Sequence, residues 1–232
     1  RKITSEYLVP KFLFFKNIFF QSMPISISIC GYALAAAIIF TYVGQSGEYA
    51  VAGYGVGTRI EQVVLLPILG INTAIISIIA QNYGANNLIR IKETYFTAIK
   101  YAFIIMITAG TLVFLSASVI TGFFSNDPEV IEYGKRYLKI SAFVLPAYPV
   151  FFLSNGFFMA LKKSENAMIS NFFRNVLNPI VVFYISKHIN ASFETFFWIW
   201  VGINWFFSIS YFFIIIYYFK LKLNKSSTVV QP

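Results

Sequence analysis

Long apolar stretches separated by short polar connections run through this chain. A membrane-spanning helix needs about 20 mostly apolar residues, and the chain contains several segments of that length. They lie at about residues 21–43, 52–80, 101–123, 138–161, 167–185 and 193–219. The pattern therefore predicts an all-α integral membrane protein, built as a six-transmembrane-helix bundle and followed by a tail at residues 220–232.

The connections between these segments are short, so consecutive helices are expected to run antiparallel in one bundle. The connection before the fourth segment also carries a helix-start signal. Asp127 can cap a helix, Pro128 fits its first position, and Glu129 suits the positive end of the helix dipole. We therefore predict a short surface helix at residues 130–140, with Glu132 close enough to pair with basic residues one turn later.

The composition agrees with a membrane protein and excludes a soluble domain. Hydrophobic residues make up 58% of the chain, the mean hydropathy is +0.70, and only 12% of residues are charged. A soluble domain is typically about 25% charged. Cys30 is the single cysteine, so an internal disulfide is impossible.

The net charge of +9 is distributed unevenly across the predicted bundle. One side holds only five of the basic residues, namely Arg59, Lys135, Arg136, Lys139 and Lys187. Cytoplasmic loops carry an excess of Lys and Arg, so the other side is predicted to be cytoplasmic, with both ends of the segment on it and the protein in the plasma (inner) membrane. The basic residues form no compact patch with interleaved aromatics, which argues against nucleic acid as a partner and leaves membrane lipid.

Polar residues inside the second segment are the main candidates for function. Ionisable groups at membrane depth are costly and often mark a cavity or a pathway. Glu61 and Gln62 could line a polar cavity together with Tyr54, while Arg59 steadies a neighbouring helix. Alternatively, Arg59 and Glu61 extend to the headgroup level. Binding of a coupling ion by Glu61 itself is a third interpretation.

Helix-breaking residues interrupt three of the six segments. Proline removes a backbone hydrogen bond and bends a helix, and polar groups or water must then satisfy the freed carbonyl. Each bend is either static or a hinge that opens a cavity. The candidates for bending or gating are Pro67, Gly70, Pro146, Pro149 and Pro179, and the accompanying polar candidates for a cavity are Asn72, Asn155 and Asn178.

No set of catalytic residues is evident. The single histidine, His188, is predicted to be a solvated loop residue. No serine has a histidine base on a neighbouring segment, and no Cys or His cluster could bind a metal. We therefore expect neither an enzyme nor a cofactor. Arg174, in the fifth segment, is predicted to be an anchor at the cytoplasmic interface.

Several motifs resemble one transporter family. Residues 54–62, with Pro67, Gly70 and the ending Gln-Asn-Tyr-Gly-Ala at 81–85, are similar to the eighth helix of the MATE (multidrug and toxic compound extrusion) transporters. Residues 124–130 resemble the start of the tenth helix of that family. The resemblance covers about residues 14–219 and implies the second lobe of a twelve-helix transporter.

The resemblance implies a fragment of a secondary active antiporter. Such a protein exports organic cations in exchange for sodium or protons by rocking of two lobes. Because the chain begins with Arg1, we expect a piece of a longer protein whose N-terminal six-helix lobe is absent. Segments 21–43 and 138–161 lack the acidic residues that several family members carry there, so the coupling ion, Na⁺ or H⁺, is expected to bind mainly in the missing lobe. The alternatives are a lipid-linked oligosaccharide flippase of the same superfamily and a non-transporting scaffold.

Overall fold

A computed structural model describes the backbone of residues 12–228, the side chains of residues 30–221 and a few side chains before them. The described part is helical throughout, apart from short connections. Its α-helices are α1 (Phe12–Val43), α2 (Glu48–Gly84), α3 (Leu88–Gly122), α4 (Pro128–Ser141), α5 (Tyr148–Ala160), α6 (Ser164–Phe172), α7 (Asn178–His188) and α8 (Phe193–Thr228). Short 3₁₀ turns lie at Gly44–Ser46 and Leu145–Ala147, and a π turn lies at Phe173–Leu177.

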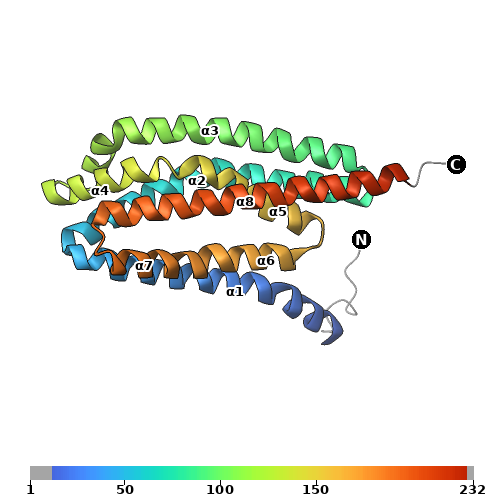
Figure 1. Ribbon diagram of the computed structural model, residues 1–232, viewed down its shortest axis with the longest axis horizontal. Helices are drawn as coiled ribbons and strands as arrows, with labels where there is room; N and C mark the ends of the chain where they lie inside the picture. The colour runs from blue at the N-terminus through green and yellow to red at the C-terminus, as the bar shows by residue number, and fades with distance from the viewer. Residues whose placement is uncertain (1–11, 229–232) are drawn as a thin grey trace, which may run out of the picture.

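The helices run back and forth along one direction, as Figure 1 shows. One end, which we call the Gly47 end, carries the connections at residues 44–47, 123–127 and 189–192. The opposite end, the Asn86 end, carries the connections at residues 85–87 and 161–163. Helices α4 and α5 continue one another across a short break, and α6 continues into α7 through the π turn, so each predicted segment corresponds to one pass of the chain.

Four helical segments of the described residues are long and apolar enough to cross a membrane. They are Glu48–Gly84, Leu88–Gly122, Pro128–Ala160 and Phe193–Leu221. The predicted segments 21–43 and 167–185 are also helical. Of the first, the described side chains contribute the shorter apolar helix Cys30–Ser46. The fifth segment is the one in which polar residues interrupt the apolar run.

The predicted helix at residues 130–140 is present as part of α4, but its predicted position on the surface is wrong. Helix α4 is part of the third long segment and packs closely on α2 and α3. Gly53 and Gly134 allow this approach, because a Cβ on Gly53 would lie 2.7 Å from the backbone N of Gly134. The predicted cap is confirmed: an oxygen of Asp127 accepts hydrogen bonds from the backbone N–H groups of Glu129 at 2.9 Å and Val130 at 3.3 Å.

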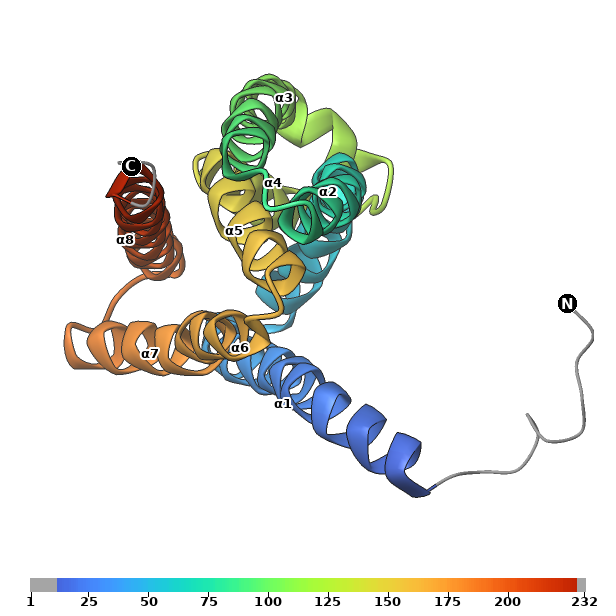
Figure 2. The ribbon, with the colours of Figure 1, turned by 90° about the vertical axis from the view of Figure 1, so that its right-hand side faces the viewer.

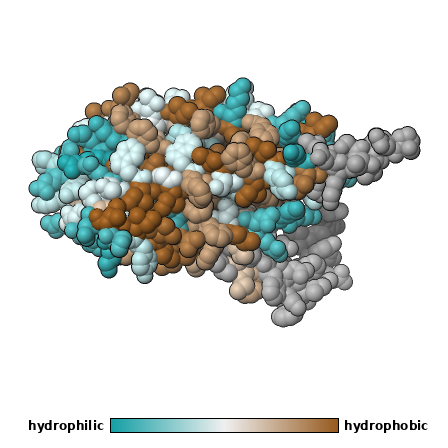
Figure 3. All heavy atoms as spheres, in the orientation of Figure 1, coloured by the Kyte–Doolittle hydropathy of each residue, from teal (hydrophilic) through white to brown (hydrophobic). Residues whose placement is uncertain are grey.

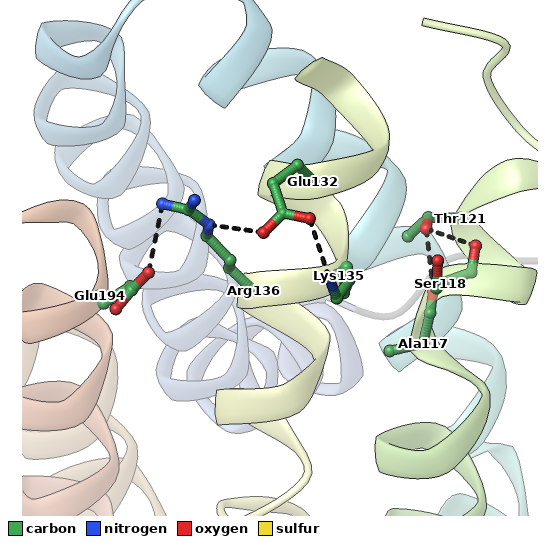
Figure 4. A network of polar contacts seen from close by, with 7 residues as sticks. All are labelled: Ala117, Ser118, Thr121, Glu132, Lys135, Arg136 and Glu194. Carbon is green, nitrogen blue, oxygen red and sulfur yellow. Dashed lines mark hydrogen bonds and ion pairs between the residues drawn. The ribbon is translucent and has the colours of Figure 1, made fainter. Parts of the chain in front are cut away.

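An ion-pair network connects α4 to α8 at the Gly47 end (Figure 4). Glu132 accepts hydrogen bonds from Lys135 at 2.9 Å and Arg136 at 3.0 Å, which confirms the predicted pairing. Arg136 also reaches Glu194 on α8 at 3.3 Å. These side chains are about half exposed, and Figure 3 shows hydrophilic residues gathered at this end and apolar residues across the middle of the face.

The helices form two groups that meet along the bundle. Figure 2 shows α2, α3, α4 and α5 as one cluster and α1 with α6 and α7 as another layer, while α8 stands beside both. The contacts agree, since α8 packs on α7 and on α5. Helix α8 continues to Thr228, through most of the predicted tail at residues 220–232; residues 229–232 and 1–11 lie outside the described part.

Candidate functional site

The carboxylate of Glu61 is the centre of a polar site between the two groups of helices. The hydroxyl of Tyr137 on α4 donates to one carboxylate oxygen, and the hydroxyl of Tyr148 donates to the other. Tyr148 is the first residue of α5, so the two tyrosines stand on opposite sides of the α4–α5 break. Hydrogen bonds to a charged group are roughly twice as strong as neutral ones, and this pair fixes the orientation of the carboxylate.

Arg174 approaches the same site from the π turn. Its guanidinium carbon lies 4.1 Å from the ring centroid of Phe151, 4.9 Å from that of Tyr148 and 5.5 Å from that of Phe152. Its Nε donates to the side-chain oxygen of Asn204 on α8 at 3.3 Å. A guanidinium over aromatic faces is attracted by their π electrons, so the rings hold the charge inside the bundle.

The predicted role of Arg174 as an interface anchor is therefore wrong. Only 7% of the residue is exposed, and its Nη1 has no hydrogen-bond partner among the described residues. The π turn explains this placement, because one extra residue in a turn changes the direction in which the following side chains point. The arginine contributes its charge to the protein interior and not to the membrane surface.

A cavity of about 230 Å³ lies against Glu61 and Arg174. Its walls come from α1, α2, α4, α5, α8 and the π turn, and seven of its sixteen lining residues are aromatic. The lining residues are Tyr32, Ala35, Ala36, Ile39, Phe40, Tyr54, Thr58, Glu61, Gln62, Leu65, Tyr137, Tyr148, Arg174, Asn175, Phe197 and Trp200. One acidic and one basic side chain among aromatic rings give the cavity both charges and apolar faces.

Three of the predicted site residues line this cavity: Tyr54, Glu61 and Gln62. The Tyr54 ring packs edge-on against Tyr137 at 4.9 Å between centroids and stacks on Phe197 at 5.4 Å. Arg59 lies elsewhere, exposed on α2 and outside the lining. Arg59 and Glu61 therefore point in different directions, as their spacing of two residues on a helix requires.

The predicted asparagines lie away from Glu61. Asn155 accepts from the Tyr211 hydroxyl at 3.3 Å and donates to Asn171 at 3.4 Å, beside a second cavity of about 430 Å³ between α5, α6 and α8. Asn72 packs its Oδ1 against Gly156, and that oxygen has no hydrogen-bond partner among the described atoms. Asn178 is fully buried, and neither atom of its amide has a partner within the described part.

Comparison with known families shows to which protein family this helical bundle belongs. Residues 24–184 match the family model MatE, which is more than half of the chain. The chain belongs to the MATE family. It is accordingly a multi-pass membrane chain, and the family to which it belongs consists of transporters and not of enzymes.

Curated relatives of this MATE chain are transporters. It is 25% identical over 154 residues to the multidrug export protein MepA of Staphylococcus haemolyticus, covering 66% of this chain and 34% of that protein. It is 29% identical over 107 residues to an FAD transporter of Shewanella oneidensis, covering 46% of this chain and 24% of the relative. The chain thus spans about a third or less of the length of these relatives.

Solved MATE structures share the fold over half of their length. A MATE protein in complex with MaL6 has a TM-score of 0.84 at 20% identity, over 98% of this chain and 51% of the other. An outward-facing MATE transporter gives 0.79 at 21% identity over 99% of this chain and 50% of the other. An inward-facing one gives 0.80 at 20% identity over 99% and 52%. The chain therefore corresponds in fold to one half of a twelve-helix MATE transporter.

The predicted helix breakers occupy different positions in this MATE lobe. Pro67 lies inside α2, which remains one continuous helix, and a Cβ on Gly70 would meet no atom within 4 Å. Pro146 lies in the 3₁₀ turn between α4 and α5, and Pro149 follows at the start of α5. Pro179 follows the π turn at the start of α7. Pro146 and Pro149 thus stand at helix starts, where the missing N–H costs little, whereas Pro179 lies where the π turn passes directly into α7.

Sequence reasoning missed Tyr137, Tyr148, Phe197 and Trp200, and it placed Arg174 at the membrane surface. Tyrosine and phenylalanine are so frequent in this chain that no single one stands out. The two tyrosines that bind Glu61 lie 76 and 87 residues away from it along the chain. The sequence held one indication only: a carboxylate inside a membrane needs hydrogen-bond donors. This indication did not show which residues supply them.

Proposed function

We propose that this chain is one lobe of a secondary active antiporter that exports organic cations, drugs among them, in exchange for sodium ions or protons. The observation that carries the proposal is the Glu61 carboxylate at an aromatic-walled cavity inside a membrane bundle. A carboxylate attracts a cation, and the faces of Tyr, Phe and Trp rings bind cations and flat apolar groups. The multidrug export protein of S. haemolyticus, which this chain resembles, supports the same substrate class.

Rocking of two lobes is the proposed mechanism of alternating access. The chain matches half of an outward-facing and half of an inward-facing MATE transporter almost equally well, with TM-scores of 0.79 and 0.80. A lobe whose fold agrees with both states is suited to move as a rigid body. The match to half of each structure supports a second six-helix lobe as the partner, with the substrate cavity between the two.

The coupling ion is proposed to bind mainly in that partner lobe. Segments 21–43 and 138–161 contain no Asp or Glu, and Glu61 is already held by two tyrosine hydroxyls. Within this lobe, Tyr54, Glu61 and Gln62 are the proposed substrate contacts. Pro67 is the proposed bending point of α2, since it leaves the carbonyl one turn earlier without its helical partner.

Both ends of the chain are proposed to face the cytoplasm, with the protein in the inner membrane. The Asn86 end carries Arg90, Lys92, Lys162 and Lys163. An excess of basic residues on one side favours the cytoplasm for that side. The Gly47 end is then outside the cell.

The flippase alternative is less well supported by the cavity. A site for a lipid-linked oligosaccharide, with its phosphate groups, is expected to present several cationic side chains. Arg174 is the one basic residue among the described lining residues, and the acidic Glu61 belongs to the same lining. A scaffold would not require a polar cavity at all.

The test uses inverted membrane vesicles that contain this chain together with its proposed partner lobe. Ethidium movement is measured under an imposed sodium or proton gradient, with Glu61→Gln and with Glu48→Gln as a matched control, because Glu48 is an exposed acid in the first turn of the same helix. We expect gradient-driven movement that Glu61→Gln reduces at least tenfold and Glu48→Gln leaves unchanged. Absence of movement under either gradient would overturn the antiporter; an unchanged rate in Glu61→Gln would remove Glu61 from the pathway.

A further inference from the structure

An apolar groove lies between α3 and α8, and it shares no lining residue with the cavity at Glu61. It has a volume of about 540 Å³, and α3 and α8 form its walls. Residues 142–146, which connect α4 to α5, form its floor. Both wall helices lie on the face shown in Figure 1, and Figure 3 shows that this face is apolar across its middle.

The groove has the length of one membrane leaflet. Its lining on α3 runs from Phe103 to Phe114, which is about 16 Å at the helical rise of 1.5 Å per residue. The hydrocarbon core of a bilayer is about 30 Å thick, so one leaflet is about 15 Å. On α8 the lining includes Trp198 and Trp205, and tryptophan is enriched where membrane meets water.

The polar atoms inside the groove already have partners within the protein. The Trp205 Nε1 donates to the carbonyl of Phe143 at 2.8 Å. The Thr111 hydroxyl donates to the carbonyl of Ile107 at 2.9 Å. A polar ligand would therefore find little to bind in the interior of the groove, whereas a hydrocarbon chain would bury apolar surface there.

A basic side chain lies at the rim nearest the Gly47 end. The Nζ of Lys139 lies 5.4 Å from the ring centroid of Phe114, which is itself a lining residue. Helix α4 carries two further basic residues, and both Lys135 and Arg136 form ion pairs with Glu132. Lys139 has no acidic partner among the described residues, so its charge is available to a ligand.

We propose that the groove is a binding site for an anionic phospholipid of the leaflet at the Gly47 end. One acyl chain lies between α3 and α8, and the phosphate of the headgroup binds the Lys139 ammonium. The charge complementarity at the rim selects the headgroup, since a basic residue near the membrane surface attracts anionic lipids. The bound lipid fills the space between α3 and α8. Without it, neither helix would have a neighbour at this position.

The experiment uses the three tryptophans of the chain as reporters. Trp198 and Trp205 line the groove, whereas Trp200 lines the cavity at Glu61. In Trp200→Phe the fluorescence therefore comes from the groove alone. The protein is reconstituted in bilayers of phosphatidylcholine with a small, fixed fraction of phosphatidylglycerol, and in each sample one of the two lipids has brominated chains, which quench nearby tryptophan.

We expect brominated phosphatidylglycerol to quench the tryptophan fluorescence about fivefold more per lipid molecule than brominated phosphatidylcholine. One basic residue near the membrane surface attracts an anionic headgroup by about 1 kcal/mol, which corresponds to this ratio. Lys139→Gln should abolish this preference, and Lys139→Arg should keep it. Lys187→Gln is the matched control, because Lys187 is an exposed basic residue at the same end, in the last turn of α7.

Three outcomes would overturn the proposal. Equal quenching by the two lipids in the unsubstituted groove would mean that it holds bulk lipid without selection. Loss of the preference in Lys187→Gln as well would assign it to the general charge of this end. No quenching by either lipid would mean that another protein or a second copy of the chain covers the groove.

Discussion

The guanidinium of Arg174 lies over the ring of Tyr148, with 4.9 Å between its central carbon and the ring centroid. The hydroxyl of the same tyrosine donates to the carboxylate of Glu61. One tyrosine thus contacts a positive group with its ring face and a negative group with its hydroxyl. The two charges of the cavity are thereby held close together without a direct ion pair among the described interactions.

Replacement of Tyr148 by Phe separates the two contacts. The ring under Arg174 remains, but Glu61 loses one of its two hydrogen-bond donors. A hydrogen bond to a charged group contributes about 1.5–3 kcal/mol, so we expect the free energy of unfolding to fall by about 1–3 kcal/mol. Denaturant unfolding in detergent measures this change in the free energy of unfolding. Tyr184→Phe is the control, because Tyr184 is 70% exposed; an equal loss in both variants would contradict the prediction.

Replacement of Arg174 by Lys tests the stacked guanidinium. Lysine keeps the charge but has neither the planar group that lies 4.1 Å from the Phe151 ring nor an Nε to donate to Asn204. We expect a loss of stability of about 1–2 kcal/mol, the size of a desolvated cation–π contact. Arg59→Lys, at an exposed arginine of α2, should be nearly neutral. Equal stability of the two variants would show that the charge alone matters.

Gly57 tests the packing that positions Tyr137. A Cβ at this residue would lie 2.2 Å from the Cδ1 of the Tyr137 ring, and that ring is held by Tyr54, Phe197 and its bond to Glu61. Overpacking of this kind costs about 1–3 kcal/mol. We expect Gly57→Ala to lower both stability and ethidium export.

The matched control on the same helix is Gly55→Ala. A Cβ at Gly55 would meet no atom within 4 Å. Alanine is the better helix former by roughly 1 kcal/mol, so this variant should be neutral or slightly stabilised. If Gly55→Ala were as harmful as Gly57→Ala, the cause would lie in the helix itself and not in its contact with Tyr137.

Pro67 tests whether α2 bends during transport, as proposed above. Replacement by Ala supplies an N–H to the carbonyl of Val63, one turn earlier, and stiffens the helix. We expect export to slow severalfold while the affinity for ethidium, measured by fluorescence titration, stays the same. Gly70→Ala, where a Cβ meets no neighbour, should act in the same direction. Unchanged export rates in both variants would contradict bending of α2 as a step of transport.

The ion pair between α4 and α8 should contribute little to stability. Arg136 and Glu194 are 3.3 Å apart, but their side chains are 46% and 49% exposed. Exposed ion pairs contribute about 0–1 kcal/mol and are screened by salt. Thermal unfolding of Glu194→Gln at low and at high salt checks this. A large loss at low salt that disappears at high salt would show instead that the network holds α8 in place (Figure 4).

The sequence by itself determined the helices and the family. The length of the apolar runs sets where helices form, because every backbone group in lipid needs a partner inside its own segment. Local signals were equally reliable at Asp127, whose capping role depends only on the next three residues. The motifs at 54–62 and 81–85 identified the family that the model match at 24–184 confirmed.

Only the tertiary structure decided which polar side chains meet. Glu61 finds its donors 76 and 87 residues away, and Arg174 is buried under aromatic rings and not at the membrane surface. Helix α4 likewise proved to be a packed part of the bundle. The physical reason is that lipid tails and protein cores are equally apolar, so hydropathy cannot tell a helix face turned to lipid from one turned to a neighbouring helix. That choice depends on the packing of all the helices together.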